Sequence, residues 1–140
     1  MEYFKDDQVS VDEIFYTDEN VKITLGNLTS TYPGYNIWIS VQSLLKDSYL
    51  KIKTHEEPIV IDYPRKLIIK DNFGNNLGLK WISPIGNKNI RPYEEEKFSI
   101  STKEIPLNSV SYLNLTIPEG VFGNKEKFTF KIPSTRITRK

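Results

Sequence analysis

The sequence predicts an all-β fold of about nine or ten short strands, and three observations lead to this prediction. Apolar and polar side chains alternate in the second half of the chain, for example over residues 113–117 and 128–132, and a period of two is that of a half-buried strand. Alanine is absent, whereas Ile, Tyr, Phe, Thr and Val are frequent, which favours strands over helices. Clusters of Pro, Gly and Asn separate the runs, as in a β-sandwich or barrel.

The first half of the chain contains four predicted strands, at residues 8–16, 21–25, 35–45 and 49–54. In the third of these, Ile37 and Ile39 share one face and Trp38 lies on the other, because successive side chains alternate across a strand. Trp38 is therefore expected to point away from the core. The segment 29–34, before this strand, contains Pro33-Gly34 and is predicted to be a loop.

The second half contains six predicted strands, at residues 59–61, 65–70, 77–83, 97–101, 112–117 and 127–132. The segment Asp71–Asn76 is the strongest hairpin signal, because its Asn and Gly residues tolerate left-handed backbone angles. The apolar run at 67–69 is expected to be buried on both faces or to lie at a sheet junction. Residues 84–92 are predicted to be a loop, and residues 104–109 allow a short helical turn.

The predicted core follows from the inward parity of these strands. Trp81 is assigned to it because it falls in register with Leu77 and Leu79. The predicted core residues are Val21, Ile23, Ile37, Ile39, Val41, Leu50, Ile52, Leu79, Trp81, Phe98, Ile100, Leu113, Leu115, Phe128 and Phe130.

Composition limits the classes of function. The 140 residues suit a single domain over residues 1–140. The net charge is +1 with both signs interspersed, so no nucleic-acid partner is expected, and the basic tail of Arg136, Arg139 and Lys140 is expected to be a solvated end. Without cysteine, disulfides and thiol catalysis are excluded. No apolar run approaches the ~20 residues of a transmembrane segment.

The segment from about Lys66 to Ile132 resembles the C-terminal part of bacterial immunoglobulin-like (telokin-like) sandwich domains of unknown function. The resemblance rests on the Asp71–Asn75 hairpin, the strand through Trp81, and the approach Ile90-Arg-Pro-Tyr-Glu94 to Phe98. It also rests on the strands Leu113-Asn-Leu-Thr-Ile117 and Phe128-Thr-Phe-Lys-Ile132. The family usually carries glycine where Tyr93 stands. The resemblance implies an immunoglobulin-like antiparallel sandwich, an extracytoplasmic location with the leader absent from this chain, and no catalytic residues.

Few residues suit catalysis or metal binding. His55 is the single histidine, and it lies in a polar sequence with no nucleophile beside it, so an exposed loop histidine is expected. The turn at Asp71–Asn76 offers oxygen ligands for calcium, but its spacing does not match an EF-hand loop. We therefore expect no catalytic residue, no metal and no cofactor.

The leading functional prediction is a non-enzymatic binding module that contacts another protein through end loops or a strand edge. The residues expected to make this contact are Tyr32, Tyr35 and Trp38. The alternative is a carbohydrate-binding module in which these exposed aromatic side chains stack on sugar rings. A hydrolase with two close carboxylates is a third, less favoured hypothesis. A monomer or weak oligomer is expected.

Overall fold

The structure is a computed structural model that describes residues 14–31, 34–55, 67–84, 86–104 and 110–139. Within these residues the chain forms eleven β-strands, one short 3₁₀ turn and no α-helix. The elements are β1 (Phe15–Thr17), β2 (Val21–Thr31), β3 (Gly34–Ser43), β4 (Leu50–Ile52), β5 (Ile68–Asp71), β6 (Leu79–Ser83), β7 (Lys88–Ile90), β8 (Glu95–Thr102), β9 (Tyr112–Ile117), β10 (Phe128–Pro133), η1 (Ser134–Arg136) and β11 (Ile137–Arg139). The all-β prediction is confirmed.

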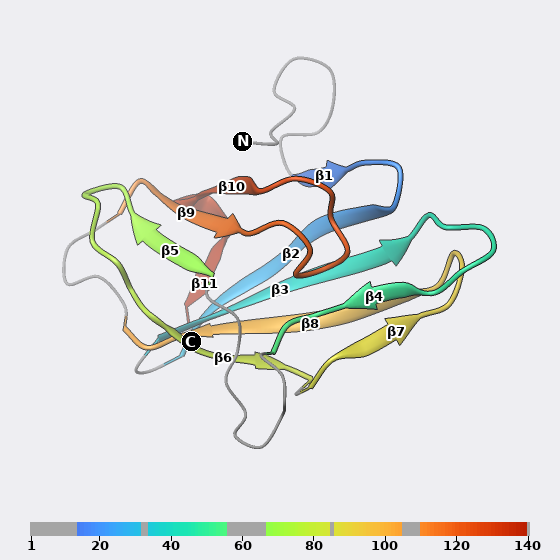
Figure 1. Cartoon of the computed structure of the whole chain (residues 1–140). Helices are drawn as coiled ribbons and strands as arrows, with labels where there is room; N and C mark the ends of the chain where they lie inside the picture. Colours follow the sequence, from blue (N-terminus) through green and yellow to red (C-terminus); the bar gives the residue numbers. More distant parts are fainter. Residues whose placement is uncertain (1–13, 32–33, 56–66, 85, 105–109, 140) are drawn as a thin grey trace, which may run out of the picture.

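The strands form three sheets (Figure 1). The largest has the order β1-β2-β3-β8-β6, with β11 also paired to β2, the second has the order β10-β9-β5, and the third consists of β4 and β7. Ten strands pair antiparallel, whereas β11 runs parallel to β2. Because β3 occupies one edge of β2 along its length, β1 and β11 share the opposite edge.

The β2–β3 hairpin is longer than the sequence predicts. The two strands remain paired as far as Thr31 and Gly34, so the predicted loop at 29–34 is strand at both of its ends. The polar residues of this segment lie in a paired strand, and their polarity alone does not distinguish the strand from a loop. A Cβ atom on Gly34 would lie 2.1 Å from the Thr102 carbonyl oxygen, so the close approach of β3 to the end of β8 requires glycine at this position.

One apolar core joins the two larger sheets. The Tyr16 ring from the six-stranded sheet stacks on Phe128 from the three-stranded sheet, with 4.1 Å between ring centroids. Phe98 of β8 packs edge-on against Phe122, with 5.2 Å between centroids. Every predicted core residue is buried except Leu79, which is half-buried, and Trp81, which is exposed.

Two further predictions about the strands are wrong. Ile68 is exposed between the buried Leu67 and Ile69, so β5 is buried on one face only, as expected for a strand with simple alternation. The predicted loop at 84–92 contains β7, which pairs with β4. The predicted strand at 59–61 lies outside the described residues, as does most of the helical turn expected at 104–109.

The loop between β9 and β10 closes the core from one end. Asn124 is buried, and its side-chain amide nitrogen donates to the carbonyl oxygens of Pro118 (3.1 Å) and Glu126 (2.7 Å). Its Oδ1 accepts from the Phe122 N–H at 3.1 Å. Because these hydrogen bonds replace the water that a buried amide would lose, they stabilise a loop conformation that places Phe122 in the core.

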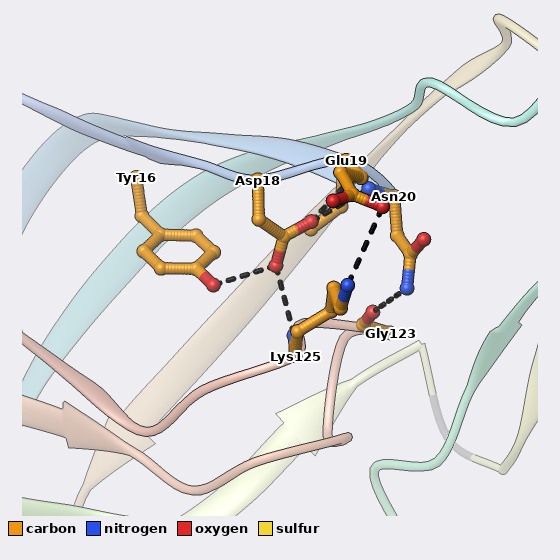
Figure 2. Close-up of polar contacts among 7 residues, drawn as sticks. Tyr16, Asp18, Glu19, Asn20, Gly123 and Lys125 are labelled. Atoms are coloured by element: carbon orange, nitrogen blue, oxygen red, sulfur yellow. Dashed lines mark hydrogen bonds and ion pairs between the residues drawn. The ribbon is translucent and has the colours of Figure 1, made fainter.

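A second polar cluster ties this loop to the turn between β1 and β2 (Figure 2). The Asp18 carboxylate accepts from the Tyr16 hydroxyl at 2.5 Å and from the Lys125 N–H at 2.8 Å. Its other oxygen accepts from the N–H groups of Asn20 (2.7 Å) and Val21 (3.1 Å). One side chain thus caps its own turn and anchors a segment that is 107 residues away in the sequence.

Candidate functional site

The strongest candidate site lies on the outer face of the six-stranded sheet. Trp38 on β3 is 42 % exposed and Trp81 on β6 is 47 % exposed. The two strands flank β8, on which Ser99 pairs with Trp38 and Ser101 pairs with Trp81. We call this surface the tryptophan face, defined by Asn36, Trp38, Ser40, Trp81, Lys97, Ser99 and Ser101.

Register gives the spacing of the two indoles. They are separated by two strand-to-strand steps and by two residues along β8. With standard sheet dimensions, their Cα atoms lie roughly 12 Å apart. The chain has two tryptophans in total, so both of its indoles lie on this face.

A pocket of about 520 Å³ opens beside Trp38. The residues that line it include Thr24, Gly26, Asn27, Trp38, Ser40 and Lys97. A register shift between Leu25 and Leu28 bulges β2 at this point, and such bulges redirect side chains at functional edges. A Cβ atom on Gly26 would lie 3.1 Å from the Trp38 carbonyl oxygen, so the backbones of β2 and β3 approach closely at this bulge. The volume lies in the usual range for small-molecule sites, roughly 300–1,000 Å³.

Neutral polar groups lie between the two indoles, where Ser99 and Ser101 are buried and Asn36 is half-buried. The Oδ1 atom of Asn36 accepts hydrogen bonds from the hydroxyl groups of Ser99 and Ser101. Within the described part of the chain, the Nδ2 group of Asn36 has no protein partner. This amide is half-buried and can donate to a ligand oxygen.

The three contact residues predicted from the sequence do not form one surface. Trp38 is exposed as predicted, whereas Tyr35 is only 6 % exposed. Tyr35 has the same parity as Ile37 and Ile39 and faces the core, and its N–H donates to Thr102 Oγ1 at 2.8 Å. Tyr32 lies outside the described residues. The expectation of an exposed Tyr35 is wrong because β3 begins before it, which places it in the inward register.

Trp81 is the site residue that the sequence analysis misassigned. The pairing of β6 with β8 shifts between Leu79 and Trp81, so Lys80 is an extra residue and Trp81 moves to the outer face. Ile82 takes the buried position instead. The sequence feature that could have indicated the outward position of Trp81 is Ser83, because it shares the parity of Trp81 and is polar.

His55 is not an exposed loop residue, and this prediction is also wrong. It is 1 % exposed, and its Nδ1 atom accepts from the Gly86 N–H at 3.2 Å and lies 2.8 Å from Thr54 Oγ1. The His55 N–H donates to Asn87 Oδ1 at 2.9 Å. These contacts join the end of β4 to the segment before β7, which indicates a structural role.

The turn after β5 is closed by an isolated bridge between Lys70 and Asn76, but the predicted hairpin does not continue into paired strands. Instead β5 pairs with β9, and β6 pairs with β8 in the other large sheet. The Asp71 carboxylate accepts from the N–H groups of Phe73 and Asn75, each at 2.9 Å, and from the Asn75 amide at 3.1 Å. Burial by the loop acts to raise the pKa of this carboxyl, but hydrogen bonds from Asn75, Phe73 and Gly74 hold the pKa below its ordinary value. The hydrogen bonds of the turn therefore explain the position of the Asp71 carboxylate without a bound cation.

Comparisons with known proteins give no match to a family model, a curated protein or a solved structure. The resemblance to bacterial immunoglobulin-like domains therefore stays a prediction. In the part of the chain that the structure describes, no helix is long and apolar enough to span a membrane.

Proposed function

We propose that this protein is a non-enzymatic binding module with an immunoglobulin-like sandwich, and that it binds carbohydrate on the tryptophan face. The observation that carries this proposal is the exposure of both tryptophans of the chain on one sheet face, beside a pocket and neutral polar groups. Exposed tryptophans in such an arrangement are typical of binding sites rather than of a solvated surface.

Strand order supports the immunoglobulin-like assignment. A constant-type immunoglobulin domain has one sheet of order A-B-E-D and another of order G-F-C. Strands β2-β3-β8-β6 and β10-β9-β5 have the same order when they are lettered along the chain. Strands β1, β11 and the β4–β7 pair are additions to this scheme. The strand in the position of C, β5, carries no tryptophan, so this core differs from that of antibody domains.

The chemistry of the face supports a sugar as the ligand. A pyranose ring has an apolar C–H face and a rim of hydroxyl groups. An indole offers a flat apolar surface of matching size. The half-buried amide of Asn36 and the pocket residues Asn27 and Ser40 offer neutral hydrogen-bond partners. Apolar walls with a few placed polar groups are the usual composition of a ligand site.

A non-enzymatic role is supported by how the chain uses its reactive groups. His55 is engaged by Thr54 and Gly86 within a buried contact. The carboxylates of Asp18 and Asp71 accept hydrogen bonds from their own turns. Groups held in this way stabilise loops and are not oriented toward a substrate.

Tryptophan fluorescence tests the proposal directly, because both indoles report from the proposed site. Titration with a panel of soluble oligosaccharides is expected to quench or shift the emission for at least one of them. Trp38→Ala should weaken that binding by about 30-fold or more, which corresponds to about 2 kcal/mol for a central aromatic contact. Phe73→Ala is the matched control, because Phe73 is an exposed aromatic residue at the tip of the Asp71 hairpin. Equal affinity of the Trp38→Ala variant, or no response to any glycan, would overturn the proposal.

A protein partner at one end of the molecule is the second candidate function. Tyr93 is 55 % exposed and has φ 64°, in a turn closed by the Glu94 N–H and the Arg91 carbonyl at 3.0 Å. With Pro92 before it, this is the position of a type II turn that glycine normally occupies. An exposed tyrosine in a strained conformation is typical of a contact residue. Tyr93→Gly should leave folding intact but reduce capture of a partner from the native host, whereas unchanged capture would exclude this surface.

An extracytoplasmic location is part of the proposal and is supported by the resemblance of residues 66–132 to domains of secreted proteins and lipoproteins. Fractionation of the native host with an antibody against this chain tests it. Recovery in the cytoplasmic fraction alone would contradict it.

A further inference from the structure

The sheet surface around the two indoles of the tryptophan face has a net positive charge. The net charge of the full chain is +1. Among the described side chains of β1, β2, β3, β6 and β8, the charged ones that face outward are Lys22, Lys80, Lys97 and Glu95. Glu95 and Lys22 both lie opposite Gln42, at the end of the sheet away from the indoles, which leaves Lys97 and Lys80 near them. The centre of this face is therefore cationic.

The lysines near the indoles differ from those that are paired elsewhere. Lys88 lies 3.1 Å from Glu96 and Lys125 lies 3.4 Å from Glu19. In the described residues, by contrast, neither Lys97 nor Lys80 has an acidic partner. Unpaired cations beside a pocket attract an anionic ligand.

A different lysine lies near each of the two indoles. Lys97 lines the pocket with Trp38, and it lies one strand across and two residues along from it, a diagonal distance of about 8 Å between Cα atoms. The Lys80 ammonium group lies 4.4 Å from the centroid of the Trp81 ring. A cation thus lies near each of the two indoles, in contact with the ring at Trp81 and as a neighbour in the pocket at Trp38.

We propose that the ligand of the tryptophan face is an acidic oligosaccharide, in which a sugar ring stacks on Trp38 and its carboxylate or sulfate group binds the Lys97 ammonium. This inference rests on the proposed carbohydrate function and assigns the ligand class. A second acidic unit of the same chain binds at Trp81 and Lys80. The separation of roughly 12 Å between the two pairs requires an oligosaccharide rather than a single sugar.

A single-stranded nucleic acid also combines stacking groups with negative charge. The observations favour a saccharide because the accessible polar groups around Trp38 are mostly neutral, at Asn27, Asn36 and Ser40, whereas a nucleic-acid groove tracks the backbone with many cations. An oligonucleotide is therefore one arm of the test.

Calorimetric titration of the full chain at low salt with four probes tests the inference. The probes are an oligogalacturonate, a sulfated heparin-derived oligosaccharide, a neutral cello-oligosaccharide of similar length and an oligothymidylate. We expect one of the two acidic saccharides to bind at least about tenfold more tightly than the neutral one, and its affinity to fall as salt is raised. The preferred probe identifies the acidic group as carboxylate or sulfate.

Two variants connect the result to the site. Lys97→Gln should weaken the acidic saccharide by about tenfold, the scale of one charge-assisted contact, and leave neutral binding unchanged. Lys51→Gln is the matched control, because Lys51 is an exposed lysine on β4, outside the tryptophan face.

The outcomes separate this inference from the proposed function. Equal affinity for neutral and acidic saccharides, with no effect of Lys97→Gln, overturns the inference and leaves the carbohydrate function standing. No binding of any saccharide overturns both. Tighter binding of the oligothymidylate than of every saccharide also overturns both and assigns the face to single-stranded nucleic acid.

Discussion

Substitution of Gly123 by alanine tests how the loop between β9 and β10 packs against the core. Gly123 has φ 77°, and a Cβ atom there would lie 2.3 Å from Leu50 Cδ1 and 2.8 Å from Leu50 Cγ. Leu50 is buried on β4, so it has little room to move. An added methyl group is therefore expected to destabilise the fold in two ways, through backbone strain at a positive φ and through the clash with Leu50.

The magnitude follows from adding these costs. A non-glycine residue in a left-handed conformation costs about 1–2 kcal/mol, and an extra methyl group forced into a packed core costs about 1–3 kcal/mol. Gly123→Ala should therefore lower the free energy of unfolding by about 2–5 kcal/mol. For a chain of this length, a loss of about 3 kcal/mol corresponds to a fall in Tm of about 10 °C.

Gly120→Ala is the matched control, because Gly120 lies in the same loop with φ 85°, and a Cβ atom there would have no neighbouring atom within 4 Å. It should incur the backbone cost alone, about 1–2 kcal/mol. Urea unfolding followed by far-UV circular dichroism measures both variants. Adding Leu50→Ala should relieve the clash, so that Gly123→Ala costs less in that background. If Gly123→Ala costs no more than Gly120→Ala, the packing argument is refuted.

Two further predictions concern carboxylates that accept hydrogen bonds from their own turns. Asp18→Ala should destabilise the fold by about 2 kcal/mol in the same urea experiment, because four donors lose their acceptor. Glu19→Ala is the control, because it removes only the exposed 3.4 Å ion pair with Lys125. It should change the free energy of unfolding by less than about 0.5 kcal/mol. For Asp71, the folded-state pKa lies below the ordinary value of 3.8, so its stabilisation is complete above that pH and is lost as the pH falls through the folded-state pKa. The Tm of the wild type should therefore fall more steeply below about pH 4 than that of Asp71→Asn, and parallel curves would contradict this.

Local alternation in the sequence was sufficient for much of the fold. Strands β9 and β10 alternate between buried and half-buried residues along their length, and their inward residues were predicted correctly. The outward position of Trp38 followed from the same rule. Alternation works here because the side-chain period of a strand is two wherever pairing is regular.

Prediction failed where tertiary pairing interrupts that period. One extra residue in β6 reverses the faces of Trp81 and Ile82, and a shift of one residue moves every later side chain to the opposite face. The error at Tyr35 was different, because its parity with Ile37 and Ile39 already indicates an inward face. The burial of His55 depends on partners distant in sequence, such as Gly86. No local pattern contains this information.

The sequence by itself determined the class of the fold, most of the core and one of the two exposed indoles, because these depend on local periodicity. Only the tertiary structure decided that Trp81 joins Trp38 on one face, with Lys97 and Lys80 beside them. Such a site is assembled by strands that are neighbours in space and not in sequence, and its geometry depends on bulges whose positions are set by pairing.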